Sequence, residues 1–231
     1  SADTADASRD LTAELVKLVQ AMQEIKAEED SRVNSYEIFV NQKQTHIRNS
    51  RGVDVTFSGF DCEIEVVTNS RKDDHEIEIY KDLRFSDKSA EKIIAEVRGM
   101  FHTGRQRLNA VPTLQNEHAD VLLTGNAVGS FFQYFAMHTN ASYQYMGVAK
   151  AKIGEAITGA DADPLNIRLV PTLDGSAKNA PYDETGMPVA ERVLFENGIC
   201  RSYWGSLQHA HYIGMKDTTS MNNMVVEGGS K

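Results

Sequence analysis

Cysteine is scarce in this sequence, and positive charge is not in excess. Only two of the 231 residues are cysteine, Cys62 and Cys200, and they lie far apart outside any C-x-x-C pair, so neither a disulfide framework nor a cysteine-based zinc site is indicated. There are 24 Lys and Arg against 33 Asp and Glu, which gives a net charge of −9. Affinity for DNA or RNA depends on clustered cations, and the basic residues here are scattered. The composition therefore argues against a nucleic-acid partner.

Long apolar runs are missing as well. No stretch approaches the roughly 20 apolar residues that a membrane helix needs. The first residues also lack the basic segment followed by an apolar segment that is typical of a secretion signal. We therefore expect a cytoplasmic protein without a membrane partner. Hydrophobic residues make up 41% and charged residues 25% of the chain, as in ordinary globular proteins. The length favours two domains.

The first part of the chain predicts helices packed on an antiparallel sheet. Apolar residues recur at intervals of three and four over residues 10–29, which is typical of a helix with one buried face. From Tyr36 the period shifts to two, which predicts a meander of short strands at 36–40, 44–49, 52–58, 61–68 and 75–80. A second helix is expected after a cap at Ser86-Asp87, ending before Gly104. This α+β domain is expected to span residues 1–112.

The second part, residues 113–231, is expected to be mostly β. A short buried strand at 119–123 should lead into a helix with Val128, Phe131, Phe132 and Phe135 on one side. Further strands are predicted at 167–170, 189–195 and 199–204, with a helix or turn at 208–213 and a last strand at Val225-Val226. Asn197-Gly198 is the strongest hairpin signal, because both residues tolerate positive φ angles. The predicted fold class is α+β.

Residues that could carry chemistry are few. His209-Ala210-His211 contains the only close pair of histidines, and the two rings share a face only if the segment is a strand. Asp183 and Glu184 lie in a turn-like stretch, where Asp usually binds its own backbone. Gly125-x-x-x-Gly129 lacks the further glycine and the lysine of a phosphate-binding loop. Taken by their own chemistry, these residues do not form a recognisable active site.

Three segments, in this order along the chain, resemble a known family. They are Asn49-Ser50-Arg51-Gly52-Val53, Asp183-Glu184-Thr185-Gly186-Met187-Pro188 and Leu194-Phe195-Glu196-Asn197-Gly198-Ile199. The pattern is similar to that of the TldD/PmbA family, also called modulators of DNA gyrase. The resemblance implies a system in which TldD members are zinc metalloproteases and PmbA or TldE members are their partners. It also implies that the chain covers the middle domain and the beginning of the C-terminal domain.

The sequence departs from the family at the zinc motif. Catalytic members carry His-Glu-x-x-x-His after a strand that ends in Leu-Leu, whereas here Leu122-Leu123-Thr124 is followed by Gly125 and Asn126, with Ser130 four residues later. By position, Gly125 and Ser130 replace the two histidine ligands and Asn126 replaces the catalytic glutamate. Glycine cannot coordinate a metal, and an amide cannot accept a proton from zinc-bound water. The resemblance thus implies a member without its own zinc cofactor.

These considerations give a leading hypothesis and alternatives. The leading one is a non-catalytic PmbA/TldE-like subunit of a zinc metalloprotease system that acts on peptides or unfolded proteins. It would form a homodimer or a heterodimer with a zinc-bearing TldD-like subunit. One alternative is an active metallopeptidase with a relocated site at His209 and His211, aided by Asp183 or Glu184. Another is a peptide- or protein-binding module in which Asn126 and Ser130 donate hydrogen bonds to a peptide.

Overall fold

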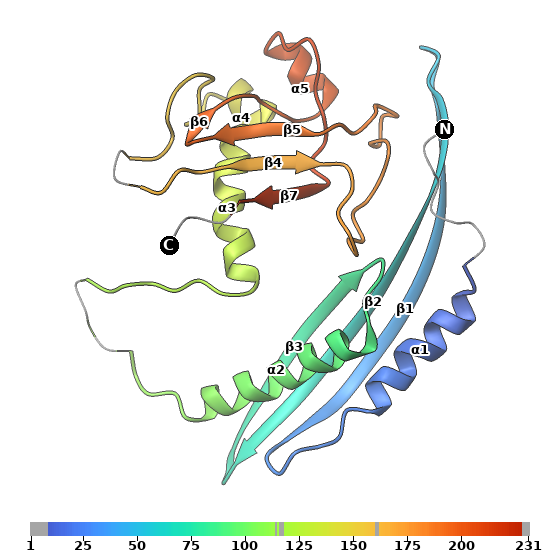
Figure 1. Ribbon diagram of the computed structural model, residues 1–231, viewed down its shortest axis with the longest axis vertical. Helices are drawn as coiled ribbons and strands as arrows, with labels where there is room; N and C mark the ends of the chain where they lie inside the picture. The colour runs from blue at the N-terminus through green and yellow to red at the C-terminus, as the bar shows by residue number, and fades with distance from the viewer. Residues whose placement is uncertain (1–8, 114, 116–117, 160–161, 228–231) are drawn as a thin grey trace. The chain divides into compact units, whose positions relative to one another are not determined.

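The computed structural model describes residues 9–113, 115, 118–159 and 162–227. It contains helices and antiparallel sheets, which confirms the α+β class (Figure 1). The chain forms two compact units. The first comprises Ser1–Thr45, Ser58–Glu117 and Asp174–Ala177, and the second comprises His46–Phe57, His118–Leu173 and Lys178–Lys231. His46–Phe57, from the first half of the sequence, thus belongs to the second unit, and Asp174–Ala177, from the second half, belongs to the first. A domain boundary at residue 112 stays a prediction.

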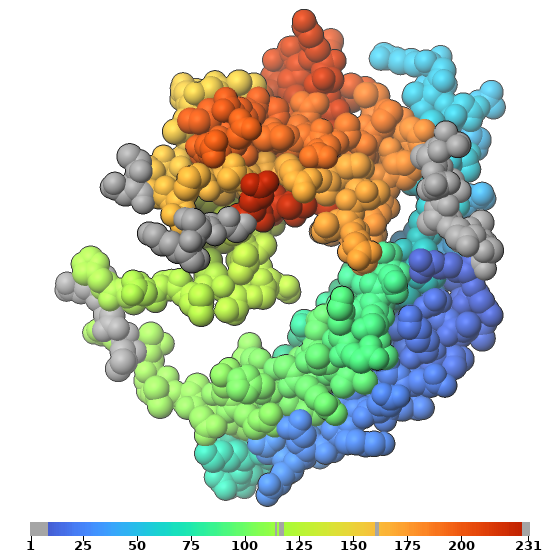
Figure 2. Space-filling view, viewed as in Figure 1, coloured from blue at the N-terminus to red at the C-terminus, as the bar shows by residue number. Residues whose placement is uncertain are grey.

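The first unit is a three-stranded sheet with two helices on one face. Its elements are α1 (Leu11–Gln23), β1 (Ser31–Arg48), β2 (Asp54–Lys72), β3 (His75–Phe85) and α2 (Ala90–Leu108), and the strand order is β1-β2-β3. β2 and β3 pair antiparallel from Cys62↔Phe85 to Lys72↔His75. Figure 2 shows the helical side of this unit, where the blue atoms of α1 lie against the green atoms of α2.

The core of the first unit lies between the helices and the sheet. Alternate residues of β2 point inward and are buried, because the side chains of a strand alternate between its two faces. They meet apolar residues of α1, α2 and β3. The buried set is Leu18, Met22, Ile25, Phe60, Cys62, Ile64, Val66, Leu83, Phe85, Ile93, Val97, Met100 and Phe101.

The prediction of five short strands in this unit is wrong, since three long strands form instead. The gaps between predicted strands at 41–43 and 59–60 lie inside β1 and β2, although they hold residues typical of turns such as Asn41 and Gly59. The side chains of Asn41 and Lys43 reach across the outer face and donate to the carboxylate of Asp61, at 3.1 and 3.2 Å. These polar residues therefore mark the solvent side of a continuous strand and do not end it.

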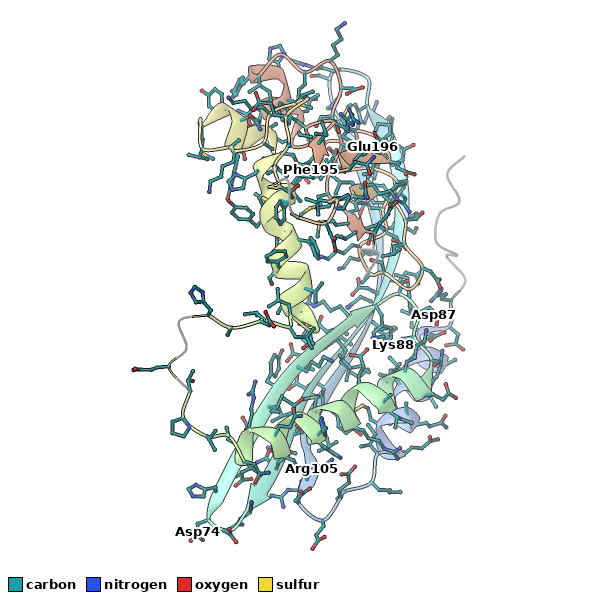
Figure 3. All side chains as sticks on the ribbon, turned by 60° about the vertical axis from the view of Figure 1, so that its left-hand side comes forward. Asp74, Asp87, Lys88, Arg105, Phe195 and Glu196 are labelled. Atoms are coloured by element: carbon teal, nitrogen blue, oxygen red, sulfur yellow. The ribbon has the colours of Figure 1, made fainter. Side chains whose placement is uncertain are left out.

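Both predicted helices of this unit form, with shifted ends. α1 ends at Gln23 and not at residue 29, and α2 is capped by the side chain of Ser89, three residues after Ser86. Gly104 lies within α2 and does not end it. Its lack of a side chain lets the helix approach β2, since a Cβ atom there would be 2.2 Å from the hydroxyl oxygen of Ser70. Near the end of α2, Arg105 donates to the carboxylate of Asp30 at 3.0 Å (Figure 3).

The second unit contains a four-stranded sheet in the order β6-β5-β4-β7. Its strands are β4 (Ile167–Val170), β5 (Arg192–Glu196), β6 (Ile199–Cys200) and β7 (Asn223–Val226). Its helices are α3 (Asn126–His138), α4 (Ala141–Tyr145) and α5 (Leu207–Tyr212). The core gathers residues of α3 and of the strands: Ala136, Ala151, Leu165, Ile167, Leu169, Leu194, Phe195, Cys200 and Trp204.

Most sequence-based expectations for this unit are confirmed. The hairpin between β5 and β6 turns at Asn197 and Gly198, with φ angles of 52° and 77°. The helix predicted around Val128 and Phe135 forms as α3, and the last strand forms as β7. The predicted strand at 119–123 is wrong: these residues adopt no regular structure, and Val121 and Leu122 are 77% and 88% exposed. The return strand is also shorter than expected, ending at Cys200.

Among the described residues, no helix is both long and apolar enough to cross a lipid bilayer.

Candidate functional site

The start of α3 is the position to which the sequence assigns the replaced zinc motif. Gly125 caps the helix with a φ of 57° and offers no side-chain hydrogen bond to it. Asn126 is the first helical residue and Ser130 lies one turn later, so their side chains are neighbours on one face. Both are exposed, and no acidic residue occurs in the first turn. This end of α3 therefore presents one amide and one hydroxyl to its surroundings.

The rest of α3 is anchored to the core of the second unit. Phe132 and Phe135 pack against its buried cluster, and the rings of Phe135 and Phe195 meet edge to face at 6.5 Å. The indole nitrogen of Trp204 donates to the carbonyl of Ala136 at 2.8 Å. The helix is thus held by its C-terminal half, whereas the residues of its first turn are exposed.

His138, near the end of α3, forms a polar cluster that the sequence analysis did not anticipate. Its Nδ1 accepts the backbone N–H of Lys150 at 3.2 Å, so a neutral ring carries its proton on Nε2. The ring of Tyr134 lies 4.4 Å away, and the Lys150 ammonium donates to the Tyr134 hydroxyl at 2.9 Å. Burial, helped by the nearby charge of Lys150, lowers the pKa of His138. The spacing of Tyr134 and His138, four residues apart on a helix, was the available signal.

The two other histidines of interest, His209 and His211, lie on helix α5. Two residues along a helix correspond to a rotation of roughly 200°, so the two rings point to different sides. The Nδ1 of His209 is 2.9 Å from the hydroxyl of Ser206, and its ring lies 6.0 Å from those of Tyr145 and Tyr212. Within the described ranges, no group of three or more His, Cys, Asp or Glu side chains could hold a metal ion.

Asp183 has a structural role, as its turn-like sequence context predicts. One carboxylate oxygen accepts the N–H groups of Thr185 and Met187, at 2.8 and 3.0 Å, together with the Thr185 hydroxyl. The other accepts the hydroxyl of Ser220 at 3.3 Å. The side chain is buried, so these bonds satisfy a carboxylate that would otherwise be costly to desolvate.

Two of the segments that carry the family resemblance meet in the second unit. The side-chain oxygen of Asn49 accepts the N–H groups of Arg51 and Val53, which forms the turn between β1 and β2. A Cβ atom on Gly186 would lie 2.4 Å from a methyl group of Val53, and the φ angle of Gly186 is 81°. Only glycine fits both the backbone conformation and this close approach.

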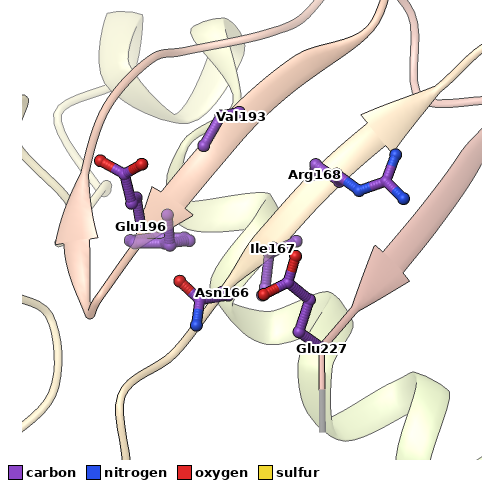
Figure 4. Close-up of a pocket in the computed structure, with 7 residues that line it drawn as sticks. Asn166, Ile167, Arg168, Val193, Glu196 and Glu227 are labelled. Atoms are coloured by element: carbon purple, nitrogen blue, oxygen red, sulfur yellow. The ribbon is translucent and has the colours of Figure 1, made fainter.

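A small pocket of about 130 Å³ lies on the sheet of the second unit, beside an irregularity between Ile167 and Arg168 of β4 (Figure 4). Its polar lining includes Asn166, Arg168, Glu196 and Glu227. Glu196 pairs with Arg201 at 2.9 Å, and Arg168 pairs with Glu191 at 3.2 Å. This volume is below the roughly 300 to 1,000 Å³ of typical small-molecule sites, so we assign no ligand to the pocket.

Comparison with known proteins places these features in a family. Residues 116–231 match the model described as the PmbA/TldA metallopeptidase C-terminal domain. TldE from Thermococcus kodakarensis superposes with a TM-score of 0.66 at 18% identity, covering 96% of this chain and 52% of that one. A protein described as a proposed modulator of DNA gyrase, from Thermotoga maritima, gives 0.64 at 16%, covering 96% and 53%.

A further solved structure with the same description, from Bacteroides thetaiotaomicron, gives a TM-score of 0.64 at 16% identity, covering 96% of this chain and 51% of that one. The chain thus spans about half the length of the solved structures it matches. At such identities the likeness shows the fold alone. A search among curated protein sequences found no match.

Proposed function

Because the chain belongs to the PmbA/TldD family, we propose that it is a non-catalytic, PmbA/TldE-like subunit of a zinc-dependent peptidase system that acts on peptides or unfolded proteins. One observation carries the proposal. Helix α3 forms and packs on the sheet, yet Gly125, Asn126 and Ser130 stand at its start where the resemblance implies two histidines and a glutamate.

The side chains at the start of α3 do not fit a catalytic zinc ion. Zinc in proteins is held by thiolates, imidazoles and carboxylates, and Gly125 has no side chain at all. The Asn126 amide has no basic lone pair with which to take a proton from a metal-bound water. Ser130 supplies only a neutral hydroxyl. We therefore assign no hydrolytic step to this helix.

A subunit of this kind would act by binding. Asn126 and Ser130 are exposed and free to donate hydrogen bonds to a peptide carbonyl. β7 lies at the end of the strand order of its sheet and pairs with β4. An extended peptide could add to this edge through backbone hydrogen bonds, which demand no particular side chains. The zinc chemistry would come from a sister chain that bears His-Glu-x-x-x-His, in a heterodimer with this one.

Metal content is the first test. The purified chain is dialysed against a weak chelator, supplied with buffered zinc, and measured by elemental analysis. We expect a molar ratio near zero for the natural sequence. The triple variant Gly125→His, Asn126→Glu, Ser130→His should bind zinc more tightly than the natural chain, because it restores the two imidazole ligands together with the glutamate that acts as base. Substitution of His209 and His211 by alanine should leave both ratios unchanged.

About one tightly held zinc per natural chain would contradict the proposal. Its loss on substitution of His209 and His211 would then locate the ion at α5.

A second measurement addresses the binding role directly. Purified sister chain is assayed for peptide cleavage with and without this chain, and with the variant Asn126→Ala, Ser130→Ala. We expect this chain to raise the cleavage rate and the variant to raise it less. An unchanged rate on addition of the natural chain would count against a role as partner.

A further inference from the structure

Helices α1 and α2 cover one face of the three-stranded sheet in the first unit. The other face, which we call the outer face, carries aromatic and acidic side chains. The side chains that alternate with the buried core residues of β2 and β3 point to this outer face. Phe39 of β1 belongs to it as well, because its neighbours Ile38 and Val40 pack toward the core. We define the outer patch as six residues of this face: Phe39, Glu63, Glu65, Val67, Tyr80 and Asp82.

Apolar surface is exposed on the outer patch. Phe39 is 42% and Tyr80 is 58% exposed, although both are large aromatic residues. Tyr80 stands opposite Val67 in the β2–β3 register, so an aromatic and a β-branched side chain form one pair across the strands. Aromatic residues that remain accessible on a sheet face are typical of protein-binding surfaces, where tyrosine supplies much of the contact energy.

Negative charge surrounds this apolar pair. Glu65 stands directly opposite Asp82, and like charges in that position destabilise a sheet. Arg84 donates to Glu63 at 2.6 Å and to Asp82 at 2.8 Å, so a single cation serves two carboxylates. In the described part of the chain, no cation pairs with Glu65. The outer patch therefore holds more negative charge than its own cations balance.

The carboxylates also affect Tyr80. Partial burial of its ring, together with the charges of Glu65 and Asp82, raises the pKa of Tyr80. A side-chain hydrogen bond to Glu65 raises the pKa of Tyr80 further, so the hydroxyl already has a partner within the outer patch. The patch combines an apolar pair and a row of carboxylates two residues farther along the strands, at a distance of roughly 7 Å.

We propose that the outer patch binds a basic, extended protein segment in which a Lys or Arg residue and an apolar residue stand two positions apart, so that both face the sheet. An extended segment places a cation and an apolar side chain about 7 Å apart at positions i and i+2, which matches the spacing between the Glu65–Asp82 and Val67–Tyr80 pairs. A second copy of this chain is a poor occupant, because its net charge is −9. Nucleic acid is repelled by the same sign of charge.

Binding is tested on the full chain by fluorescence anisotropy with a fluorescein-labelled peptide, Lys-Ser-Val-Ser-Lys-Ser-Val-Ser-Lys, in which Lys and Val alternate along one face of the extended chain. Two comparison peptides replace valine by serine or lysine by glutamate. We expect the Lys/Val peptide to bind, the Lys/Ser peptide to bind about tenfold more weakly, and the Glu/Val peptide not to bind. Raising the salt from about 0.02 to 0.3 M should weaken binding several-fold through screening.

Variants locate the site. The double variant Glu65→Gln, Asp82→Asn should weaken the Lys/Val peptide about tenfold, and Tyr80→Ala should weaken it to a similar degree. The matched control is Glu24→Gln, Glu91→Gln, which removes two exposed carboxylates from the helical side of the same unit. This control should change the affinity less than twofold. Folding is checked by thermal melts, which should be unchanged or improved when the like charges of Glu65 and Asp82 are removed.

Two results would overturn the proposal. Equal weakening by the outer-patch and control double variants would mean that the peptide responds only to the overall charge of the chain. No measurable binding of the Lys/Val peptide at low salt would mean that the patch is not a binding surface for basic segments. The proposal does not depend on the metal content of the chain, so the zinc measurement and this one can fail separately.

Discussion

The two units are stabilised in different ways. In the first, strands of 18, 19 and 11 residues place alternate apolar side chains against two amphipathic helices. In the second, the strands have only 4, 5, 2 and 4 residues. Its connections are held by side chains that bind the backbone, such as Asp183 at Thr185 and Trp204 at Ala136. Apolar burial therefore dominates one unit, and buried polar contacts are needed in the other.

The largest effect is expected from Phe101→Ala in the first unit. Phe101 is fully buried between α2 and the sheet, and its truncation leaves a cavity in a close-packed core. We expect a loss of about 3 to 5 kcal/mol in the free energy of unfolding, measured by urea unfolding with far-UV circular dichroism. Phe39→Ala, on the exposed face of β1, should cost less than about 1 kcal/mol. Equal losses of unfolding free energy in the two variants would contradict the burial of Phe101 and the exposure of Phe39.

The second largest effect is expected from Asp183→Ala in the second unit. Asp183→Ala removes the acceptor of two backbone N–H groups and leaves them without that partner. We expect a loss of about 2 to 4 kcal/mol, because unsatisfied buried donors pay their full desolvation cost. The fluorescence of Trp204, the only tryptophan, reports unfolding in the core of this unit. Glu184→Ala, the exposed neighbour, is the control and should change the midpoint little.

A smaller effect is expected where the helix approaches the sheet most closely. Gly104→Ala places a Cβ atom 2.2 Å from the Ser70 hydroxyl and 2.8 Å from its Cβ. We expect a loss of about 1 to 3 kcal/mol from overpacking, measured by chemical unfolding. Gly99→Ala, in the same helix with open space around it, should stabilise the protein by up to about 1 kcal/mol. A neutral Gly104→Ala would show that α2 can move away from β2.

The smallest effect concerns pH. The pKa of His138 is lowered by burial in the folded state, so the unfolded chain takes up a proton at a higher pH than the folded one. The contribution of His138 to stability is therefore retained above the ordinary histidine pKa and falls as the pH drops below it. Unfolding midpoints measured between pH 7.5 and 5 should fall less steeply in His138→Gln than in the natural protein. Parallel curves would contradict a lowered pKa.

The sequence predicted elements that depend on local patterns. The apolar spacing of α3 and the Asn197-Gly198 turn were sufficient, because helix periodicity and positive φ angles are properties of short segments. The wrong predictions involve residues whose structure depends on neighbours that are distant in the sequence. Asn41 looks like a turn residue until Asp61 of the next strand receives its hydrogen bond. Val121 and Leu122 look like a buried strand, yet the structure leaves them exposed.

The candidate site was predictable to a similar extent. The replacement of the zinc motif at Gly125, Asn126 and Ser130 is evident from residue types and order. The cluster around His138 was not, because Lys150 joins it from a segment twelve residues later through a backbone N–H. The outer patch was also out of reach, since it requires the β2–β3 register that sets Glu65 opposite Asp82.

By itself, the sequence determined which segments are amphipathic, where one hairpin turns and which chemical groups stand at the start of α3. Tertiary structure alone decided that β1 and β2 run on through residues typical of turns, and that Glu65 stands opposite Asp82 on the outer face of the sheet. The physical reason is that strands form cooperatively within a sheet. A strand continues when its neighbour supplies hydrogen bonds and a shared core, and these gains exceed the weak local preferences of single residues such as Asn41 and Gly59.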